Sequence, residues 1–364
     1  MVRFASKLGL SLTDASSVRF NSAVLVYYII IIGIYNLSII NFDVSIGLIS
    51  HPNSYQLPED DEYLYSSLLN IFVPHLLGIV HSKYMYYAFS VATTIVAFYI
   101  IYKFCIESLD EERRFIGFLC IMSTPIPIVL LQYSGSSSAF VTIFAALLFL
   151  SKKTIYKFLF GILLVLAHKE QGTMVAIGYI FLSYVIDEKQ ILSRENMFII
   201  IAVLIGILIN YIYIKIGSFR ITRSRMDWVT IYGPNFMRVH LLGCPLLTLF
   251  SGIGLWTAWC INYIKDNLKH PSTVYAILIY FIVSSIVASL TMDYTRVACI
   301  LMIPLFLLVT RKLCSKDLDQ PLNSSIGLSL AIMFSLLHYQ VFIYNSERGL
   351  VVQDTAWVRY PWLF

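Results

Sequence analysis

The chain has 364 residues, of which 58% are hydrophobic and only 13% charged, and its formal net charge is +5. Soluble domains carry about 25% charged residues, so this composition excludes a soluble enzyme and gives no sign of nucleic-acid binding. The apolar runs are longer than the ~10-residue alternating segments of an outer-membrane barrel. We therefore expect an all-α polytopic membrane protein, with a single integral-membrane domain over residues 1–364.

The apolar runs predict about 11 transmembrane helices, and counts of 10 to 12 fit the same pattern. In chain order, the expected spans are 23–41, 84–103, 115–132, 138–151, two short spans within 158–186, then 197–216, 239–263, 273–291, 297–310 and 322–344. Pro125 and Pro127 should bend the third span, because proline interrupts helical hydrogen bonding. The polar run from His168 to Gly172 should form the turn between the two short spans.

Four segments are expected outside the spans. Residues 1–21 are predicted as a cytoplasmic lead, 42–82 as an external loop with an interfacial helix within 64–81, 218–238 as an external Arg-rich loop, and 345–364 as an external tail.

The distribution of basic residues predicts the orientation. Sixteen of the 26 Lys and Arg residues fall on one side of this topology, and the richer side is normally cytoplasmic. The other side carries seven Arg and three Lys. Arginine suits bidentate contact with phosphate, whereas lysine is the ordinary solvated anchor. We expect an inner-membrane protein whose functional site faces the exterior.

Four consecutive acids, Glu59 to Glu62, directly follow the first predicted span in a chain where acids are scarce. Neighbouring carboxylates raise one another's pKa, which suits a general base. Asp61, Asp60 and Glu62 are therefore candidate catalytic residues. The alternative is a solvated loop without a chemical role.

Cationic and paired charges fall on the same predicted outer side. The candidate substrate-binding residues are Arg220, Arg223, Arg225, Arg238, His168, Lys169, Glu170, Asp293 and Arg296. The arginines could grip a diphosphate. For the arginine loop, the alternative is an amphipathic surface segment whose arginines meet lipid headgroups. For the other groups, the alternative is local ion pairs at turns.

An outer loop that follows the first span, carries an Asp-Asp pair and precedes a surface helix resembles the GT-C class of membrane glycosyltransferases. The resemblance implies a GT-C-like fold and a polyprenyl-phosphate-linked sugar donor. Asp60 and Asp61 match the acid pair of that class, with Asp61 as the expected base and Glu62 in reserve.

Residues 131–178 resemble bacterial polymerases of the O-antigen and exopolysaccharide type. Here the run Gln132 to Ser136 opens a short span, Lys152-Lys153 closes it, and the next short span leads to His168. Such polymerases usually place an arginine where this chain has Gln132 or Tyr133.

Together these features predict a glycosyltransferase that builds surface polysaccharide, either as a polymerase or as a single-sugar transferase. Its expected partners are a polyprenyl-linked glycan donor, a glycan acceptor and membrane lipid. A divalent metal is compatible but not required, because cationic side chains can offset the leaving-group charge. Two alternatives are a transporter or flippase of lipid-linked glycan, whose path the same charges would line, and a structural subunit.

Overall fold

The computed structural model describes residues 12–35, 37, 42–57, 59–79, 82–186, 190–191, 193–219, 225–238, 252–256, 264, 271–291, 293–314, 340–343 and 350–353. The α-helices are α2 (Leu12–Tyr35), α3 (Phe42–Ser50), α4 (Leu68–Leu76), α5 (Lys83–Ser108), α6 (Arg114–Met122), α7 (Ile126–Gln132), α8 (Ser137–Leu150), α9 (Thr154–Ala167), α10 (Lys169–Ile186), α11 (Arg194–Ile216), α12 (Arg225–Arg238), α15 (Pro271–Ser289) and α16 (Tyr294–Leu313). Short 3-10 helices are η1 (Glu59–Ser66), η2 (Glu111–Arg113) and η4 (Gly254–Trp256). The predicted all-α class is confirmed for this bundle.

One small exception is an antiparallel hairpin of β1 (Gln340–Ile343) and β2 (Leu350–Gln353), in which Ile343 lies opposite Leu350. Strand β1 occupies the end of the segment predicted as the span 322–344, so that prediction is wrong for residues 340–343. These residues include Val341, Phe342 and Ile343, and β-branched and aromatic side chains favour strands. The rest of that segment lies outside the described residues.

Four described helices are long and apolar enough to cross a membrane: Val18–Tyr35, Tyr84–Ser108, Arg194–Ile216 and Ser272–Ser289. A fifth span results if α6 and α7 count as one. The predicted number of about 11 is therefore not confirmed, and the predicted span 239–263 lies almost wholly outside the described residues. Helices α8 and α9 have 14 residues each. Fourteen residues extend about 21 Å, less than the ~30 Å hydrocarbon core.

Two predicted interruptions of the helices are confirmed. Helices α6 and α7 meet at an angle of 57° across the segment that contains Pro125. Helices α9 and α10 are separated at His168, whose backbone is extended with φ −161° and ψ 113°. The break is shorter than the predicted turn 168–172, because α10 already begins at Lys169. The first span differs from its prediction, because α2 begins at Leu12 and ends at Tyr35, six residues before the expected end. Much of the expected cytoplasmic lead thus continues the first helix.

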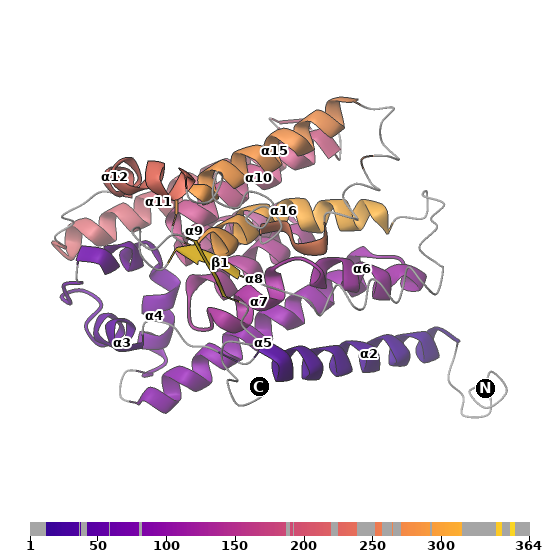
Figure 1. Ribbon diagram of the computed structural model, residues 1–364, viewed down its shortest axis with the longest axis horizontal. Helices are drawn as coiled ribbons and strands as arrows, with labels where there is room; N and C mark the ends of the chain where they lie inside the picture. Colours follow the sequence, from indigo (N-terminus) through magenta and orange to yellow (C-terminus); the bar gives the residue numbers. More distant parts are fainter. Residues whose placement is uncertain are drawn as a thin grey trace.

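Helix α16 lies at the centre of the bundle, where it packs against α10, α15, α8 and α6 (Figure 1). Seventeen of its 20 residues are buried. The surrounding helices expose large apolar side chains instead, such as Leu25 on α2, Ile95 on α5 and Leu204 on α11. An apolar exterior around a buried central helix is the arrangement that a lipid bilayer favours.

Helices α3, α4 and α12 gather toward the left end of the bundle in Figure 1, and α6 lies toward the right. The segment 218–238 differs from the loop that we expected, because Arg225–Arg238 form helix α12. The helix that we predicted within residues 64–81 is present as α4, which contains Pro74. The left end therefore collects several elements that the sequence places on the outer side.

Candidate functional site

A small cleft opens at this end of the bundle, where α3, η1, α4, α5, α8, His168 and the start of α16 meet. Its volume is about 50 Å³, and one water needs about 10–15 Å³ of such space, so the cleft holds only a few waters. The apolar residues of its lining are Leu48, Ile49, Leu64 and Ile71. The remaining lining residues are Ser45, Ser67, Asn70, Tyr86, Gly135, Ser136, Ser137, His168 and Arg296.

His168 enters the cleft from the break between α9 and α10, and it is 7% exposed. Its Nδ1 lies 3.3 Å from Oε2 of Glu170, whose Oε1 is 3.1 Å from the Lys169 ammonium. Gly172 permits this tight hairpin, because a Cβ there would overlap the Leu164 carbonyl. The three candidate residues from this turn therefore form a chain of contacts, of which His168 reaches the cleft.

The Glu170 carboxyl is strongly biased toward its ionised form. Burial raises its pKa, but the hydrogen bond and positive charge of His168, followed by the Lys169 ammonium, outweigh burial and hold the pKa well below its usual range. Glu170 therefore serves as a fixed negative charge that orients His168 and Lys169. The local ion pair that we gave as the alternative is present, and it positions the histidine.

Arg296 reaches the cleft from the first turn of α16. Asp293 caps this helix, because its Oδ1 accepts a hydrogen bond of 3.3 Å from the Arg296 backbone N–H, and its Oδ2 lies 3.1 Å from the Arg296 Nε. The guanidinium lies over the ring of Tyr133 at 4.9 Å from the centroid, a cation–π contact. The local Asp293–Arg296 pair is thus present, and the guanidinium also lines the cleft.

The turn between α7 and α8 forms the floor of the cleft. Gly135 has φ +83°, a conformation that favours glycine, and a Cβ there would lie 2.6 Å from Ser90 Oγ. Its carbonyl accepts hydrogen bonds from Asn70 Nδ2 at 2.8 Å and from the Tyr86 hydroxyl at 3.4 Å. Ser136 caps α8 by accepting from the backbone N–H of Ser138. The turn therefore ties α4 and α5 to the start of α8.

The acidic segment leads directly to the cleft. Asp60 and Asp61 lie in η1, although their side chains fall outside the described parts of the structure. The Glu62 side chain is described and is 9% exposed. Leu64, at the end of η1, and Ser67, just after it, line the cleft. The backbone of η1 thus carries the acid pair to within one or two turns of the polar lining.

Helix α11 holds η1 in place. Asn210, which is fully buried, donates a hydrogen bond of 3.1 Å to the carbonyl of Tyr65. The Tyr65 ring stacks on Phe219 with centroids 4.3 Å apart, and its hydroxyl accepts from the Leu57 N–H at 2.9 Å. The Tyr213 hydroxyl donates 2.6 Å to the carbonyl of residue 52. The contacts made by Asn210 and Tyr213 join residues 145 and 161 positions apart in sequence, and they hold the acidic segment against the bundle.

The remaining predicted site residues do not join this group. Arg220 and Arg223 lie outside the described residues, and Arg225 begins α12 with a side chain that the structure does not describe. Arg238 is exposed in the last turn of α12 and does not line the cleft. The described part of the chain gathers no three His, Cys, Asp or Glu side chains that could hold a metal.

Sequence reasoning missed several cleft residues, among them Asn70, Tyr86 and Ser137. Asn70 carried a usable signal, since it is the polar residue of an otherwise apolar turn, Leu68-Leu69-Asn70-Ile71. Its Oδ1 is buried, and no residue in the described part of the chain hydrogen-bonds to it. Serine and tyrosine are frequent throughout this chain, so the other residues could not be distinguished by type.

The residues that line the cleft combine one arginine, one histidine and several hydroxyl-bearing side chains with four apolar side chains. Such a lining can bind an anionic group that carries an apolar substituent. No protein-family model matches this sequence, and no curated protein and no solved structure matches it significantly. Function must therefore be inferred from the chemistry of the cleft.

Proposed function

We propose that this chain is an integral-membrane glycosyltransferase that uses a polyprenyl-(di)phosphate-linked sugar or oligosaccharide. The observation that carries the proposal is the mixed lining of the cleft, in which apolar groups from α3, η1 and α4 occur together with polar groups that include Arg296. A lipid-linked glycan places a phosphate between an isoprenoid chain and a sugar, so the two kinds of lining match its two parts.

Arg296 is the proposed phosphate-binding residue. The Asp293 carboxylate and the Tyr133 ring orient its guanidinium, and such a preoriented cation offsets the charge that develops on a phosphate leaving group. The guanidinium reaches the Tyr133 ring from α16, so it lies beside the position where O-antigen-type polymerases usually carry an arginine. This placement favours the polymerase form of the proposal.

The acid pair supplies the general base of the proposed reaction. The acceptor hydroxyl oxygen attacks the anomeric carbon while the bond from that carbon to the phosphate oxygen breaks, and the hydroxyl proton passes to Asp61 or Asp60. A direct displacement of this kind inverts the anomeric configuration. Because the cleft of about 50 Å³ holds only a few waters, η1 or α4 must move aside to admit the sugar.

The proposal is tested by profiling the surface glycan of a strain that lacks the gene and carries plasmid-borne variants. Arg296→Ala should lower glycan transfer by roughly 100-fold, the typical effect of removing one preoriented donor from a developing negative charge. Asp61→Asn or Asp60→Asn should also fail to restore the glycan. Arg19→Gln removes an exposed arginine on α2 and serves as the matched control, which should restore it fully.

The deletion phenotype separates the two forms of the proposal. A glycan that stops at one repeat unit indicates a polymerase, whereas a glycan that lacks one branch sugar indicates a single-sugar transferase. Full restoration by Arg296→Ala and by both acid variants, at normal membrane levels, would reject the glycosyltransferase.

A transporter of lipid-linked glycan is the second candidate, and one observation favours it. Lys157 is buried and forms an ion pair with Glu195 at the end of α9 opposite His168, so charged groups occur at both ends of this helix. A transport defect leaves the lipid-linked unit on the cytoplasmic face of the membrane. A transfer defect leaves it on the external face, where an added lectin binds it in intact spheroplasts.

A further inference from the structure

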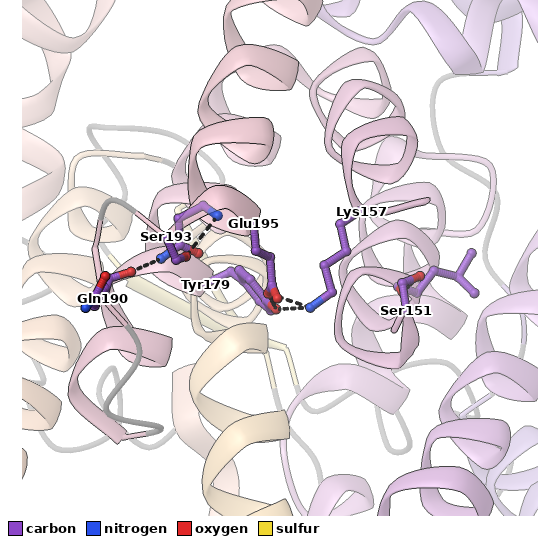
Figure 2. Close-up of polar contacts among 8 residues, drawn as sticks. Ser151, Lys157, Tyr179, Gln190, Ser193 and Glu195 are labelled. Atoms are coloured by element: carbon purple, nitrogen blue, oxygen red, sulfur yellow. Dashed lines mark hydrogen bonds and ion pairs between the residues drawn. The ribbon is translucent and has the colours of Figure 1, made fainter. Parts of the chain in front are cut away.

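A second polar cluster joins three helices at the end of α9 that is remote from the cleft (Figure 2). It consists of Lys157 on α9, Tyr179 on α10 and Glu195 on α11. The Lys157 ammonium forms an ion pair with the Glu195 carboxylate and lies 2.9 Å from the Tyr179 hydroxyl, which donates 2.8 Å to the same carboxylate oxygen. We call these three residues the Lys–Tyr–Glu cluster.

Lys157 is enclosed by protein, whereas Glu195 is partly exposed. The side chain of Lys157 is 6% exposed and that of Glu195 is 24% exposed. The Lys157 ammonium also lies 5.5 Å from the centroid of the Tyr179 ring. Removing two charges from water is costly unless geometry and extra hydrogen bonds compensate, so the residues hold the three helices in one arrangement.

The start of α11 is fixed next to this cluster. Ser193 caps the helix by accepting a hydrogen bond of 3.3 Å from the Asn196 N–H, and Asn196 Nδ2 donates 3.0 Å to the Gln190 carbonyl. Figure 2 shows Ser193 and Gln190 on one side of Glu195, with Lys157 approaching from the other. These hydrogen bonds hold the first turn of α11 in place, and with it the backbone that carries the Glu195 carboxylate.

The same three helices lead to the candidate site at their other ends. On α9, His168 follows Lys157 by 11 residues, about 16 Å of helix. On α11, Asn210 follows Glu195 by 15 residues, about 22 Å, and it bonds the Tyr65 carbonyl at the end of the acidic segment. The cluster thus links the element that carries His168 to the element that holds η1.

Close packing between α9 and α11 allows this link to act over such a distance. A Cβ on Gly161 would lie 2.9 Å from the Ala202 Cβ, and one on Gly206 would lie 2.7 Å from the Val165 Cβ. Small residues at such contacts bring helix backbones close together. A shift of α11 at the cluster is therefore carried along its length to Asn210.

We propose that Lys157, Tyr179 and Glu195 are positioning residues, which set the register of α11 against the α9–α10 hairpin and thereby place the acidic segment relative to His168. That the Lys–Tyr–Glu cluster affects glycan transfer rests on the proposed function. That it affects the geometry of the cleft does not rest on that function, so the two effects can be tested separately.

The geometric part is tested with a thiol reporter in the cleft of the full-length protein in membranes. Leu64→Cys places the reporter at the end of η1, and the parent chain serves as the blank for a small charged maleimide. Adding Glu195→Gln should raise the modification rate about tenfold, because a displaced η1 opens the cleft. Adding Glu107→Gln is the matched control, since it breaks a surface pair with Lys103 that lies within α5 alone, and the rate should stay unchanged.

Second-site variants test whether the ion pair itself, and not only the volume of the two side chains, sets the position of η1. The charge-swapped pair Lys157→Glu with Glu195→Lys keeps an acceptor for the Tyr179 hydroxyl, and it should return the rate to within about twofold of the Leu64→Cys parent. The apolar pair Lys157→Met with Glu195→Leu should not. Equal rescue by the apolar pair, or an unchanged rate in Glu195→Gln, would overturn the proposal.

The glycan profile of the same variants, without the reporter, completes the experiment. Loss of transfer in Glu195→Gln and its recovery in the charge-swapped pair are the expected results. If the thiol rates follow the prediction while Arg296→Ala and the acid variants restore the glycan fully, positioning stands and the glycosyltransferase is rejected. If the thiol rates do not follow it, positioning is rejected whatever the glycan shows.

Discussion

Two basic residues lie toward opposite ends of α9 and are used in different ways: Lys157 belongs to α9, and Arg296, on α16, lines the cleft with His168. At one end, Lys157 is surrounded by Tyr179 and Glu195, and its side chain is 6% exposed. At the other end, Arg296 contacts Asp293 and Tyr133 and yet lines a cleft, with its side chain 19% exposed. A charge enclosed by partners stabilises the helix arrangement. A charge that is oriented by partners and still borders a cavity is available to a ligand.

This contrast also explains why burial of charge alone is a poor guide to function. Lys157 is the more deeply buried cation, but the structure assigns it contacts between helices. Arg296 is less buried and lines the cleft together with apolar and polar residues. In a membrane protein, the geometry around a charge separates the two roles, and the following experiments probe that separation.

The largest expected effect is at the enclosed end. Glu195→Gln leaves the Lys157 charge buried without its counter-ion and should lower the free energy of unfolding by about 3 kcal/mol. Lys157→Met leaves the more exposed Glu195 carboxylate behind and should cost less, about 1–2 kcal/mol. Unfolding titrations with SDS in mixed micelles measure both. Equal losses would contradict the asymmetry that the exposed fractions indicate.

The next effect concerns the floor of the cleft. Gly135→Ala should destabilise the protein by about 2 kcal/mol, from backbone strain at positive φ of roughly 1 kcal/mol plus the close approach to Ser90. Gly78→Ala is the matched control, because Gly78 has φ +68° and nothing within 4 Å of an added Cβ. In the same titration, Gly78→Ala should lower the free energy of unfolding only by the backbone strain of roughly 1 kcal/mol. A loss as large as that of Gly135→Ala would show that crowding in the cleft floor has no effect.

A smaller effect is expected from the ring that orients Arg296. Tyr133→Leu removes the cation–π contact and should weaken transfer by about fivefold, which corresponds to roughly 1 kcal/mol. Tyr133→Phe keeps the ring and should retain nearly full transfer. Glycan profiles at matched expression levels measure both variants. If Phe fails as badly as Leu, the Tyr133 hydroxyl and not the ring face is what matters.

The smallest effect is the pH dependence of the His168–Lys169–Glu170 turn. Because the folded-state pKa of Glu170 is lowered, its contribution to stability is present above the ordinary glutamate pKa of about 4.3 and is lost as pH falls toward the folded value. The unfolding midpoint of the wild type should therefore drop more below about pH 4 than that of Glu170→Gln. Parallel midpoints of the two proteins between pH 7 and pH 3 would show that the turn contributes nothing.

The sequence predicted local features of the fold well. Pro125 and Pro127 indicated the bend between α6 and α7, and the polar run at His168 indicated the break between α9 and α10, because both features disrupt helices through their own chemistry. The number of spans could not be predicted so well. The bounds of α8 agree with the predicted segment 138–151 to within one residue, but the prediction counted this segment as a span, and a 14-residue helix extends only about 21 Å.

The charged residues of the candidate site and their local ion pairs were predictable, but the uncharged lining residues and the contacts between distant segments were not. His168 and Arg296 stood out as charged or titratable residues at predicted membrane boundaries, and both line the cleft. The approach of Arg296 to Tyr133 joins residues 163 positions apart, which no local pattern reports. The Lys–Tyr–Glu cluster was missed because Lys157 read as an ordinary cytoplasmic lysine.

The central position of α16 has a consequence for how the protein is made. Synthesis proceeds from the N-terminus, and α16 ends only at Leu313. Helices α6, α8 and α10 therefore enter the membrane before the helix that fills the space between them exists. Until then their inward faces must be covered by lipid or by the insertion machinery. A chain stopped at residue 290 should accordingly be degraded much faster than the full chain in a pulse-chase experiment, and equal lifetimes would show that the outer helices assemble without their centre.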